Sequence, residues 1–403
     1  MGLLVHLRWL EGGVWGKKER KGEEAEEEGG GSGERKNDGW RWIGMRKEKR
    51  RVQLTGGSTY IVSLPIKWVR ELGLKKGDEV LLLRHGKKSL VLMPVGKAVQ
   101  SEGGEKRRAE LNISESEGFE ENFRYLIALY LVGYDEIVLR AARGFNAEER
   151  KRIKAEVRKR LIGMEVVGES ATEIQLQSFL KYEDFTLCDA VKSMTESVVA
   201  MLNDALLAVE RGDVNLALDV IERDNEIDRF YLLIVRQLKA VISDYELAQK
   251  IGIGTPRNSL GYRIIVKSIE RIADHIENIA KHAILNEKAQ ASEGKLQPLS
   301  ISAERVREIR EIGNAVREVF LKTMDALSKM DMKRSNDAIR DANAVISAVE
   351  DVNERVLSEE SDATTKIHTL SILDSLARIA KYCTDIAEVT INMCIKSADE
   401  IEF

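Results

Sequence analysis

The sequence is poor in the residues on which secreted proteins and many enzymes depend. Its 403 residues include only four prolines, three cysteines and five histidines, and aromatic residues make up 5%. Cys188, Cys383 and Cys394 are odd in number and lack metal-ligand spacing, so we expect buried structural thiols in a reducing cytoplasm. No apolar run approaches the roughly 18 residues of a membrane-spanning helix. Arg8 and Glu11 interrupt the apolar start and no small-residue cleavage site follows, which predicts a cytoplasmic protein that is not an integral membrane protein.

No catalytic constellation is visible. None of the histidines lies in a serine, cysteine or metalloprotease motif. His282 and His368 fall on predicted helices without an evident partner, where surface or core roles are expected. The glycines of residues 55–59 do not form a nucleotide-binding loop, because neither Gly-Lys-Ser/Thr nor a helix follows them. We therefore expect a protein without enzyme activity.

Composition favours a helix-rich chain of two or three domains, with 43% apolar and 32% charged residues. Residues 1–44 differ from the rest. They hold four of the five tryptophans, eleven of the thirty glycines and an acidic run from Glu23 to Glu28. No hydrophobic period survives there, so a packed core is not expected. Two interpretations stay open: translation begins at Met45 and residues 1–44 are an upstream extension, or they are a disordered tail.

Short strands around one short helix are predicted between residues 46 and 94. Val52–Leu54 and Tyr60–Leu64 are rich in β-forming residues and flank a Gly-Gly turn. Pro65 suits the first turn of a helix that runs from Ile66 to Leu72 and ends at Gly73. Val80–Leu83 and Ser89–Met93 then form a hairpin. Fifty residues of this kind bury little surface alone, so we expect a second copy to complete the core.

A small α/β module follows the linker at residues 96–104. An apolar helical face runs from Phe119 to Leu131, and Glu136–Ala141 is a predicted strand. Asn146 and Glu149 form a candidate capping box for the next helix. Two more strands are predicted near Val166 and Ile174.

From Asp184 onward the sequence predicts helices nearly throughout, with a weak internal duplication. The apolar stripe from Ile265 to Ala283 recurs 107 residues later, from Ile372 to Thr390. An earlier stripe that starts at Asp213 recurs 118 residues later, at Asp331. Two three-helix units account for this pattern, each burying its stripes against its own helices and against the other unit.

Residues 50–80 are similar to a known family of small domains. Arg50 to Pro65, with its Gly-Gly turn, is followed by Leu72-Gly73-Leu74-Lys75-Lys76-Gly77-Asp78. This run resembles the SpoVT/AbrB swapped-hairpin DNA-binding domain from end to end.

The helical half resembles PhoU repeats. The resemblance rests on Asp224-x-x-x-Asp228 and on Ser268 to His275 with Asn278-Ile279-Ala280. A SpoVT/AbrB-like domain, a middle module and two such repeats resemble archaeal PhoU-like phosphate uptake regulators, which implies control of phosphate uptake. The implied fold is multidomain and mainly α: a swapped-hairpin β-domain at 45–96, an α/β module at 105–182, and three-helix PhoU-like repeats at 183–290 and 300–398 that form a helical bundle.

Basic residues precede and surround the predicted β-hairpin. In a dimer, two such arms would face a duplex, and each neutralised phosphate releases counterions. The alternative is an ordinary solvated charge run, but the SpoVT/AbrB-like context favours binding to double-stranded DNA. The candidate DNA-binding residues are Arg46, Lys47, Lys49, Arg50, Arg51, Ser58, Tyr60 and Lys67.

Four acidic residues form the candidate metal site. Asp224 and Asp228 share one helix face, as do Glu270 and Asp274 on another helix, and PhoU proteins carry metal clusters on such motifs. Carboxylates suit hard cations such as Mg²⁺, Mn²⁺, Ca²⁺ or ferric iron, so the candidate ion in the first repeat is Fe, Mg, Mn or Zn. His275 is adjacent and could ligate or cap the face. The alternative is a solvated helix face, since i,i+4 acidic pairs are common in a chain with 67 acidic residues.

Two functions stay open. The chain is a transcription regulator whose helical body senses phosphate status or docks a partner, or it is an accessory protein that inhibits a phosphate transporter by contact and uses the β-domain only to form a homodimer. The basic arm favours the first. A third function, metal buffering, would need the second repeat to keep its carboxylates, but Ala342, Ile346, Ala377 and Lys381 stand at the matching positions.

The small β-domain should be an obligate dimer. A fragment of residues 45–96 is expected to sediment as a dimer and to melt at a temperature that rises with concentration, because the partner copy completes its core. Analytical ultracentrifugation checks this expectation. A folded monomer would contradict the swapped-hairpin interpretation.

Overall fold

The computed structural model describes residues 49–85, 89–94, 107–114, 116–242, 244–286, 296–299, 301–359 and 362–395. The chain groups into two compact units, divided between Lys75 and Lys76. The expectations for residues 1–44, and for Arg46 and Lys47, lie outside the described residues. No described helix is long and apolar enough to cross a membrane.

The first unit contains a small antiparallel hairpin and one short helix. Strands β1 (Gln53–Thr55) and β2 (Thr59–Ile61) pair around Gly56 and Gly57, whose φ angles of 67° and 82° suit glycine. Helix α1 (Ile66–Glu71) follows Pro65, as the sequence predicts. The second strand was predicted to reach Leu64, but it ends at Ile61 because β1 offers it only three residues to pair with.

Apolar side chains of this unit remain in solvent. Val52 is 64% exposed and Tyr60 is 73% exposed, and Leu54 and Ile66 are more than half exposed. Among residues 49–75, which are the described part of this unit, a hairpin of six strand residues has no second layer to pack against. These side chains therefore form an uncovered apolar surface.

The second unit begins with another hairpin. Strands β3 (Val80–His85) and β4 (Ser89–Pro94) are antiparallel, with Val80 opposite Pro94. This hairpin was predicted, and both strands extend slightly farther than expected.

A four-stranded sheet with two helices follows. Its elements are β5 (Arg108–Asn112), α2 (Phe119–Val132), β6 (Glu136–Arg140), α3 (Ala147–Arg160), β7 (Met164–Glu169) and β8 (Glu173–Ser178). The order is β5-β6-β8-β7, and only β5 and β6 are parallel. Asn146 and Glu149 form the predicted capping box of α3. The sequence prediction missed β5, whose only apolar residues are Ala109 and Leu111.

One buried arginine joins this α/β module to the helical bundle. Arg236 is 1% exposed, although it carries a charge. Its guanidinium donates to the carbonyl oxygens of Tyr130 and Tyr134 and pairs with Asp135 Oδ1 at 3.0 Å. A buried charge is stable only when it is paired and hydrogen-bonded in this way. The end of α2 is therefore held firmly against the bundle helix that carries Arg236.

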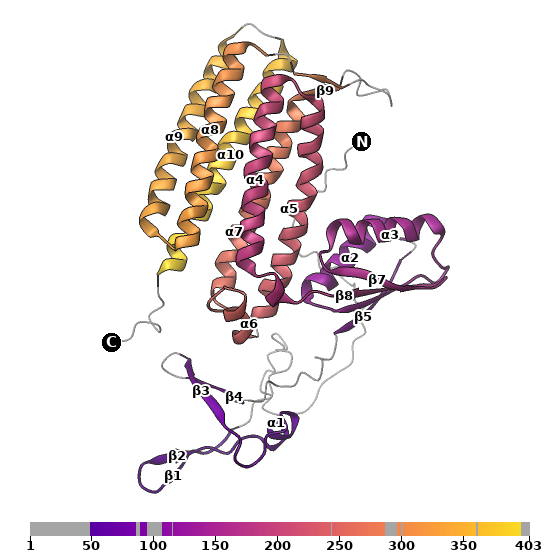
Figure 1. Ribbon diagram of the computed structural model, residues 1–403, viewed down its shortest axis with the longest axis vertical. Helices are drawn as coiled ribbons and strands as arrows, with labels where there is room; N and C mark the ends of the chain where they lie inside the picture. The colour runs from indigo at the N-terminus through magenta and orange to yellow at the C-terminus, as the bar shows by residue number, and fades with distance from the viewer. Residues whose placement is uncertain are drawn as a thin grey trace, which may run out of the picture. The chain divides into compact units, whose positions relative to one another are not determined.

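The bundle consists of six long helices in two sets of three (Figure 1). The first set is α4 (Leu187–Arg211), α5 (Val214–Val241) and α7 (Asn258–His282), and the second is α8 (Ala303–Lys329), α9 (Met332–Ser358) and α10 (Ala363–Cys394). The helical prediction is therefore confirmed. Four short elements were not predicted: the 3-10 turn Tyr182–Asp184, α6 (Tyr245–Lys250) and the pair β9 (Ile284–Asn286) and β10 (Leu296–Pro298).

The first two helices of each set repeat in detail. Asp213 and Asp331, 118 residues apart, both cap a helix with their side chains. Gly212 and Met330 precede them, and both adopt the left-handed conformation that ends the previous helix. The two sets therefore share the positions of these helix ends in addition to the apolar stripes that are visible in the sequence.

Helices α7 and α10 cross in antiparallel orientation where the two sets of three helices meet. Gly261, near the start of α7, approaches Met393, near the end of α10, so closely that a Cβ on Gly261 would lie 2.2 Å from the Met393 sulfur. His275 and Tyr382, which are equivalent positions 107 residues apart, meet each other with ring centroids 5.8 Å apart. Equivalent positions meet only near a twofold axis, so a pseudo-dyad relates the two helices.

The backbone of Met330 is in a strained conformation, and the strain can be tested by substitution. Its φ of 49° puts a side chain in the left-handed region, which costs L-residues about 1–2 kcal/mol. Met330→Gly should raise the free energy of unfolding by about 1 kcal/mol, after allowance for the greater freedom of glycine in the unfolded chain. Gly212→Ala is the matched control and should lower the melting temperature. A fall in melting temperature for Met330→Gly, measured by calorimetry, would contradict this account.

Candidate functional site

The basic arm and hairpin of the first unit are open to solvent. Among the described residues of this group, Lys49, Arg50 and Arg51 precede β1 and are exposed. Ser58 and Tyr60 lie exposed on the hairpin, and Lys67 is exposed on α1. Hydroxyl groups and cations are thus presented together, and such a surface can contact the phosphates of a polyanion.

The four predicted metal-site residues come together on α5 and α7. The two helices pack side by side, and the carboxyl groups of Asp224, Asp228 and Asp274 repel one another and Glu270. Burial and then the neighbouring Asp228 raise the pKa of Asp224 to about 8. Burial and then Glu270 raise the pKa of Asp228 to about 6 and that of Asp274 to about 7. Glu277, which sequence reasoning missed, adds a fifth carboxyl to this acidic cluster.

The acidic cluster is partly open to solvent, and nearby basic side chains neutralise only part of its charge. Asp228 and Asp274 keep part of their surface open to solvent and Asp224 is half-buried, yet the atoms packed around each carboxyl group are the largest cause of its raised pKa. Glu270 is 5% exposed and pairs with Lys267 at 2.5 Å. Arg160 of α3 lowers the pKa of Asp228 slightly. Lys267 and Arg160 thus offset only part of the negative charge.

The acidic cluster has carboxylate oxygens that can ligate a hard cation, but these oxygens do not converge on one point. Across the described residues, no three His, Cys, Asp or Glu side chains converge closely enough to hold a metal ion. No ion pair or side-chain hydrogen bond engages Asp224, Asp228 or Asp274 within that part of the chain. Their oxygens remain available, and side-chain rotation would be needed to bring them onto one ion.

The histidines and cysteines take different positions from those expected. His275 faces α10 rather than the acidic cluster: its ring lies against Tyr382, and burial and then Arg378 lower its pKa to about 4. His282 and His368, which appeared to have no partners, contact each other. Of the cysteines only Cys383 is buried. Cys188 is exposed because it begins α4 at the end of the bundle.

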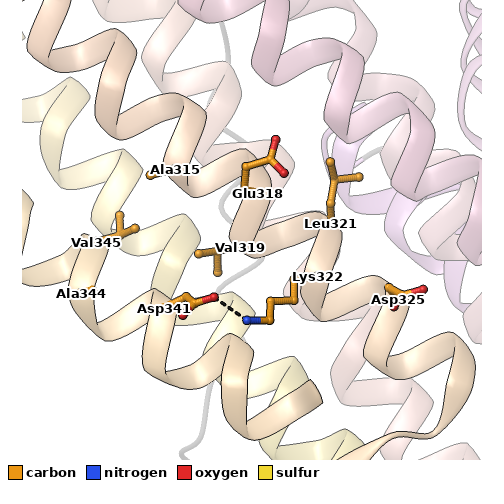
Figure 2. A pocket seen from close by; sticks show the side chains of 9 residues that line it. All are labelled: Ala315, Glu318, Val319, Leu321, Lys322, Asp325, Asp341, Ala344 and Val345. Atoms are coloured by element: carbon orange, nitrogen blue, oxygen red, sulfur yellow. Dashed lines mark hydrogen bonds and ion pairs between the residues drawn. The ribbon is translucent and has the colours of Figure 1, made fainter. Parts of the chain in front are cut away.

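An open groove between α8 and α9 carries no ligand chemistry (Figure 2). Lys322 and Asp341 line this groove and form an ion pair of 2.6 Å, so their charges offset each other. The equivalent positions of the first repeat hold the same pair with reversed polarity, Asp204 with Arg223. The contact is therefore a feature of repeat packing.

Two family profiles match the chain. The PhoU domain matches residues 191–283 and 309–390, and the profile named antidote-toxin recognition MazE, bacterial antitoxin, matches residues 53–100. The two PhoU segments coincide with the two helical repeats.

The curated relatives are phosphate-specific transport system accessory proteins. The PhoU homolog of Clostridium acetobutylicum is 25% identical over 47% of this chain and 80% of its own length. That of Borreliella burgdorferi is 27% identical over 34% of this chain. The chain spans only 58% of the Borreliella protein and 57% of the Pseudomonas putida homolog.

Two solved structures are also similar. PhoU from Pseudomonas aeruginosa shares 21% identity, covers 53% of this chain and 98% of its own, and superposes with a TM-score of 0.44. The phosphate transport system regulatory protein PhoU from Streptococcus pneumoniae shares 16% identity, covers 52% and 96%, and gives a TM-score of 0.42. PhoU and MazE/AbrB domains are non-enzymatic regulatory families, as the sequence predicts for this chain. The chain therefore carries a PhoU domain in its C-terminal region and a MazE/AbrB-type domain in its N-terminal region.

Proposed function

We propose that the chain regulates phosphate uptake and phosphate homeostasis as a DNA-binding transcription regulator. Its MazE/AbrB-type domain binds duplex DNA as a homodimer, and its PhoU body senses phosphate status or docks a partner. One observation carries this proposal: a PhoU domain shares the chain with a domain whose exposed hairpin combines a basic arm with hydroxyl groups.

The surface of the first unit supports both steps. The exposed apolar side chains of Val52, Leu54 and Tyr60 would lose contact with water when a second copy covers them, and burial of apolar area stabilises association. Pairing two copies also doubles the basic arms. Cations that neutralise phosphates release counterions, so the affinity of such a dimer would depend strongly on salt.

Duplex binding should depend on the basic arm. Substitution of Lys49, Arg50 and Arg51 with Ala should weaken binding to all sequences and flatten the salt dependence by about one unit of slope per lost phosphate contact. Fluorescence anisotropy with a duplex at several salt concentrations measures both effects.

A charge-matched control separates this contact from the effect of net charge. Lys192, Arg211 and Lys333 are exposed on the helical body, and their replacement with Ala removes the same charge. That variant should bind like the wild type. If the wild type and the arm variant have the same duplex affinity and the same salt dependence of that affinity, the DNA-binding proposal is wrong.

The alternative is an accessory protein that inhibits a phosphate transporter by contact and uses its N-terminal domain only for dimerisation. The names of the curated relatives favour it, since each is called a phosphate-specific transport system accessory protein. Capture of DNA and proteins bound in cells grown with high and low phosphate discriminates the two. Recovery of a transporter without DNA would favour the accessory role.

The proposal includes a multivalent cation in the first repeat. Asp224, Asp228, Glu270 and Asp274 lie on adjacent helices and repel one another, and a bound cation would relieve that repulsion. The ion would be Mg²⁺, Mn²⁺, Fe or Zn²⁺, with carboxylate oxygens as ligands. The second repeat has Lys381, an ammonium that repels cations, at the position of Asp274.

The metal held by the acidic cluster should therefore depend on the first repeat alone. Asp224→Asn with Asp274→Asn should remove that metal, whereas Asp374→Asn with Asp385→Asn in the second repeat should not, because Ala342, Ile346, Ala377 and Lys381 stand where the first repeat has its four carboxylates. Elemental analysis of the purified proteins measures this. The same metal content in all three proteins would mean that the cluster is a solvated helix face.

The metal-free protein provides a pH control. The pKa of Asp224 is raised to about 8 in the folded state, so between about pH 4 and pH 8 the folded chain holds a proton that the unfolded chain releases. Stability should accordingly fall as pH rises through this window, and the Asp224→Asn, Asp274→Asn variant should show a flatter fall.

A further inference from the structure

Two imidazoles meet where α7 ends and α10 begins. His282 is the last residue of α7 and His368 lies in the second turn of α10. Their Nδ1 atoms are 3.0 Å apart and their rings meet edge to face, with centroids 4.9 Å apart. Both side chains are half-buried, so solvent can reach the pair while neighbouring atoms hold the rings in place.

Packing of α7 on α10 does not require this pair. The pseudo-dyad relates His282 to Val389 and His368 to Gly261, 107 residues away in each case. Those two residues also meet, with 3.4 Å between a Val389 methyl and the place of a Cβ on Gly261. The same crossing is therefore made at the other end of the helices by two residues without polar side chains. The imidazole pair is therefore present at only one of the two ends of the contact between α7 and α10.

We propose that His282 and His368 form a two-imidazole site for a borderline transition-metal ion, with Zn²⁺, Ni²⁺ or Cu²⁺ as the class of ligand. Imidazole nitrogen is a preferred ligand of these ions. Two nitrogens bound to one ion at about 2.0–2.1 Å, at angles between a right angle and the tetrahedral angle, lie about 2.8–3.4 Å apart. The observed 3.0 Å separation of the Nδ1 atoms falls in this range.

The surroundings suit a cation with open coordination positions. His282 lies at the C-terminal end of α7, where the unpaired carbonyl groups of a helix favour positive charge. Only two protein ligands are present among the described residues, so water or a ligand of the ion would complete its shell.

The site is independent of the acidic cluster. The two sites use different residues and different donor atoms, carboxylate oxygens in the acidic cluster and imidazole nitrogens here. A bound ion here would join α7 of the first repeat to α10 of the second. Loss of either site would leave the residues of the other unchanged.

Calorimetric titration of the full-length, chelator-treated protein with Ni²⁺ or Zn²⁺ tests the proposal. The titrations use the Asp224→Asn, Asp274→Asn background, so that the acidic cluster does not contribute. One ion per chain should bind, and the melting temperature should rise with added metal. His282→Gln and His368→Gln should each remove this binding and the rise in melting temperature. His275→Gln, on the same helix but outside the pair, is the matched control and should retain both.

Two outcomes overturn the proposal. If the Asp224→Asn, Asp274→Asn protein binds neither Ni²⁺ nor Zn²⁺, the metal-site proposal is wrong and no histidine variant is needed to show it. The contact between His282 and His368 is then a hydrogen bond between two neutral rings. Undiminished binding after His282→Gln and His368→Gln places the ion elsewhere. Circular dichroism of the chelated variants verifies that they fold. The metal content of the acidic cluster, measured separately, bears on the proposed function and not on this site.

Discussion

The antiparallel crossing of α7 and α10 is the contact on which the helical body depends. Each three-helix set leaves an apolar stripe uncovered, and this crossing buries the stripe of one set against that of the other. Gly261 allows the approach of Met393, because any side chain there would collide with the sulfur. Buried residues of both sets belong to one continuous hydrophobic core, so the two repeats are packed as one body.

The shared core leaves the repeats free to differ outside it. Most buried positions of the two sets stay apolar under the shifts of 107 and 118 residues, with exceptions such as Ala217, which becomes the buried Ser335, whereas many polar positions have diverged. The ion pair of Asp204 with Arg223 returns as Lys322 with Asp341, so attraction is kept while each charge changes sign. Among the described residues, the acidic cluster and the imidazole pair each occur in one place. α7 contributes to both, with Asp274 on its α5 side and His282 on its α10 side.

Sequence reasoning was successful where the signal is local. Apolar spacing of three and four residues predicts the six long helices, and Pro65, Gly73 and the Asn146 capping box mark helix ends by their own chemistry. It failed where tertiary contacts decide. Strand β5 is short and half polar, and becomes a strand only because β6 lies beside it. The i,i+4 spacing paired Asp224 with Asp228 and Asp274 with Glu270 on two helices, but Glu277 joins them only through helix packing. His282 and His368 are 86 residues apart, and no local pattern predicts their contact.

The α/β module and the acidic cluster are physically linked through α5. Arg236 fixes the module to this helix with its buried ion pair to Asp135, and Arg160 at the end of α3 acts on Asp228 of the same helix. Arg160 also pairs with Glu120 and Glu156, so its guanidinium is shared between the module and the cluster. A cation or proton bound by the acidic cluster would weaken the attraction between Asp228 and Arg160. By reciprocity, the position of Arg160 would alter the affinity of the cluster for that cation. The buried Arg236 contact and the charge of Arg160 thus both connect the module to α5, the helix that carries Asp224 and Asp228.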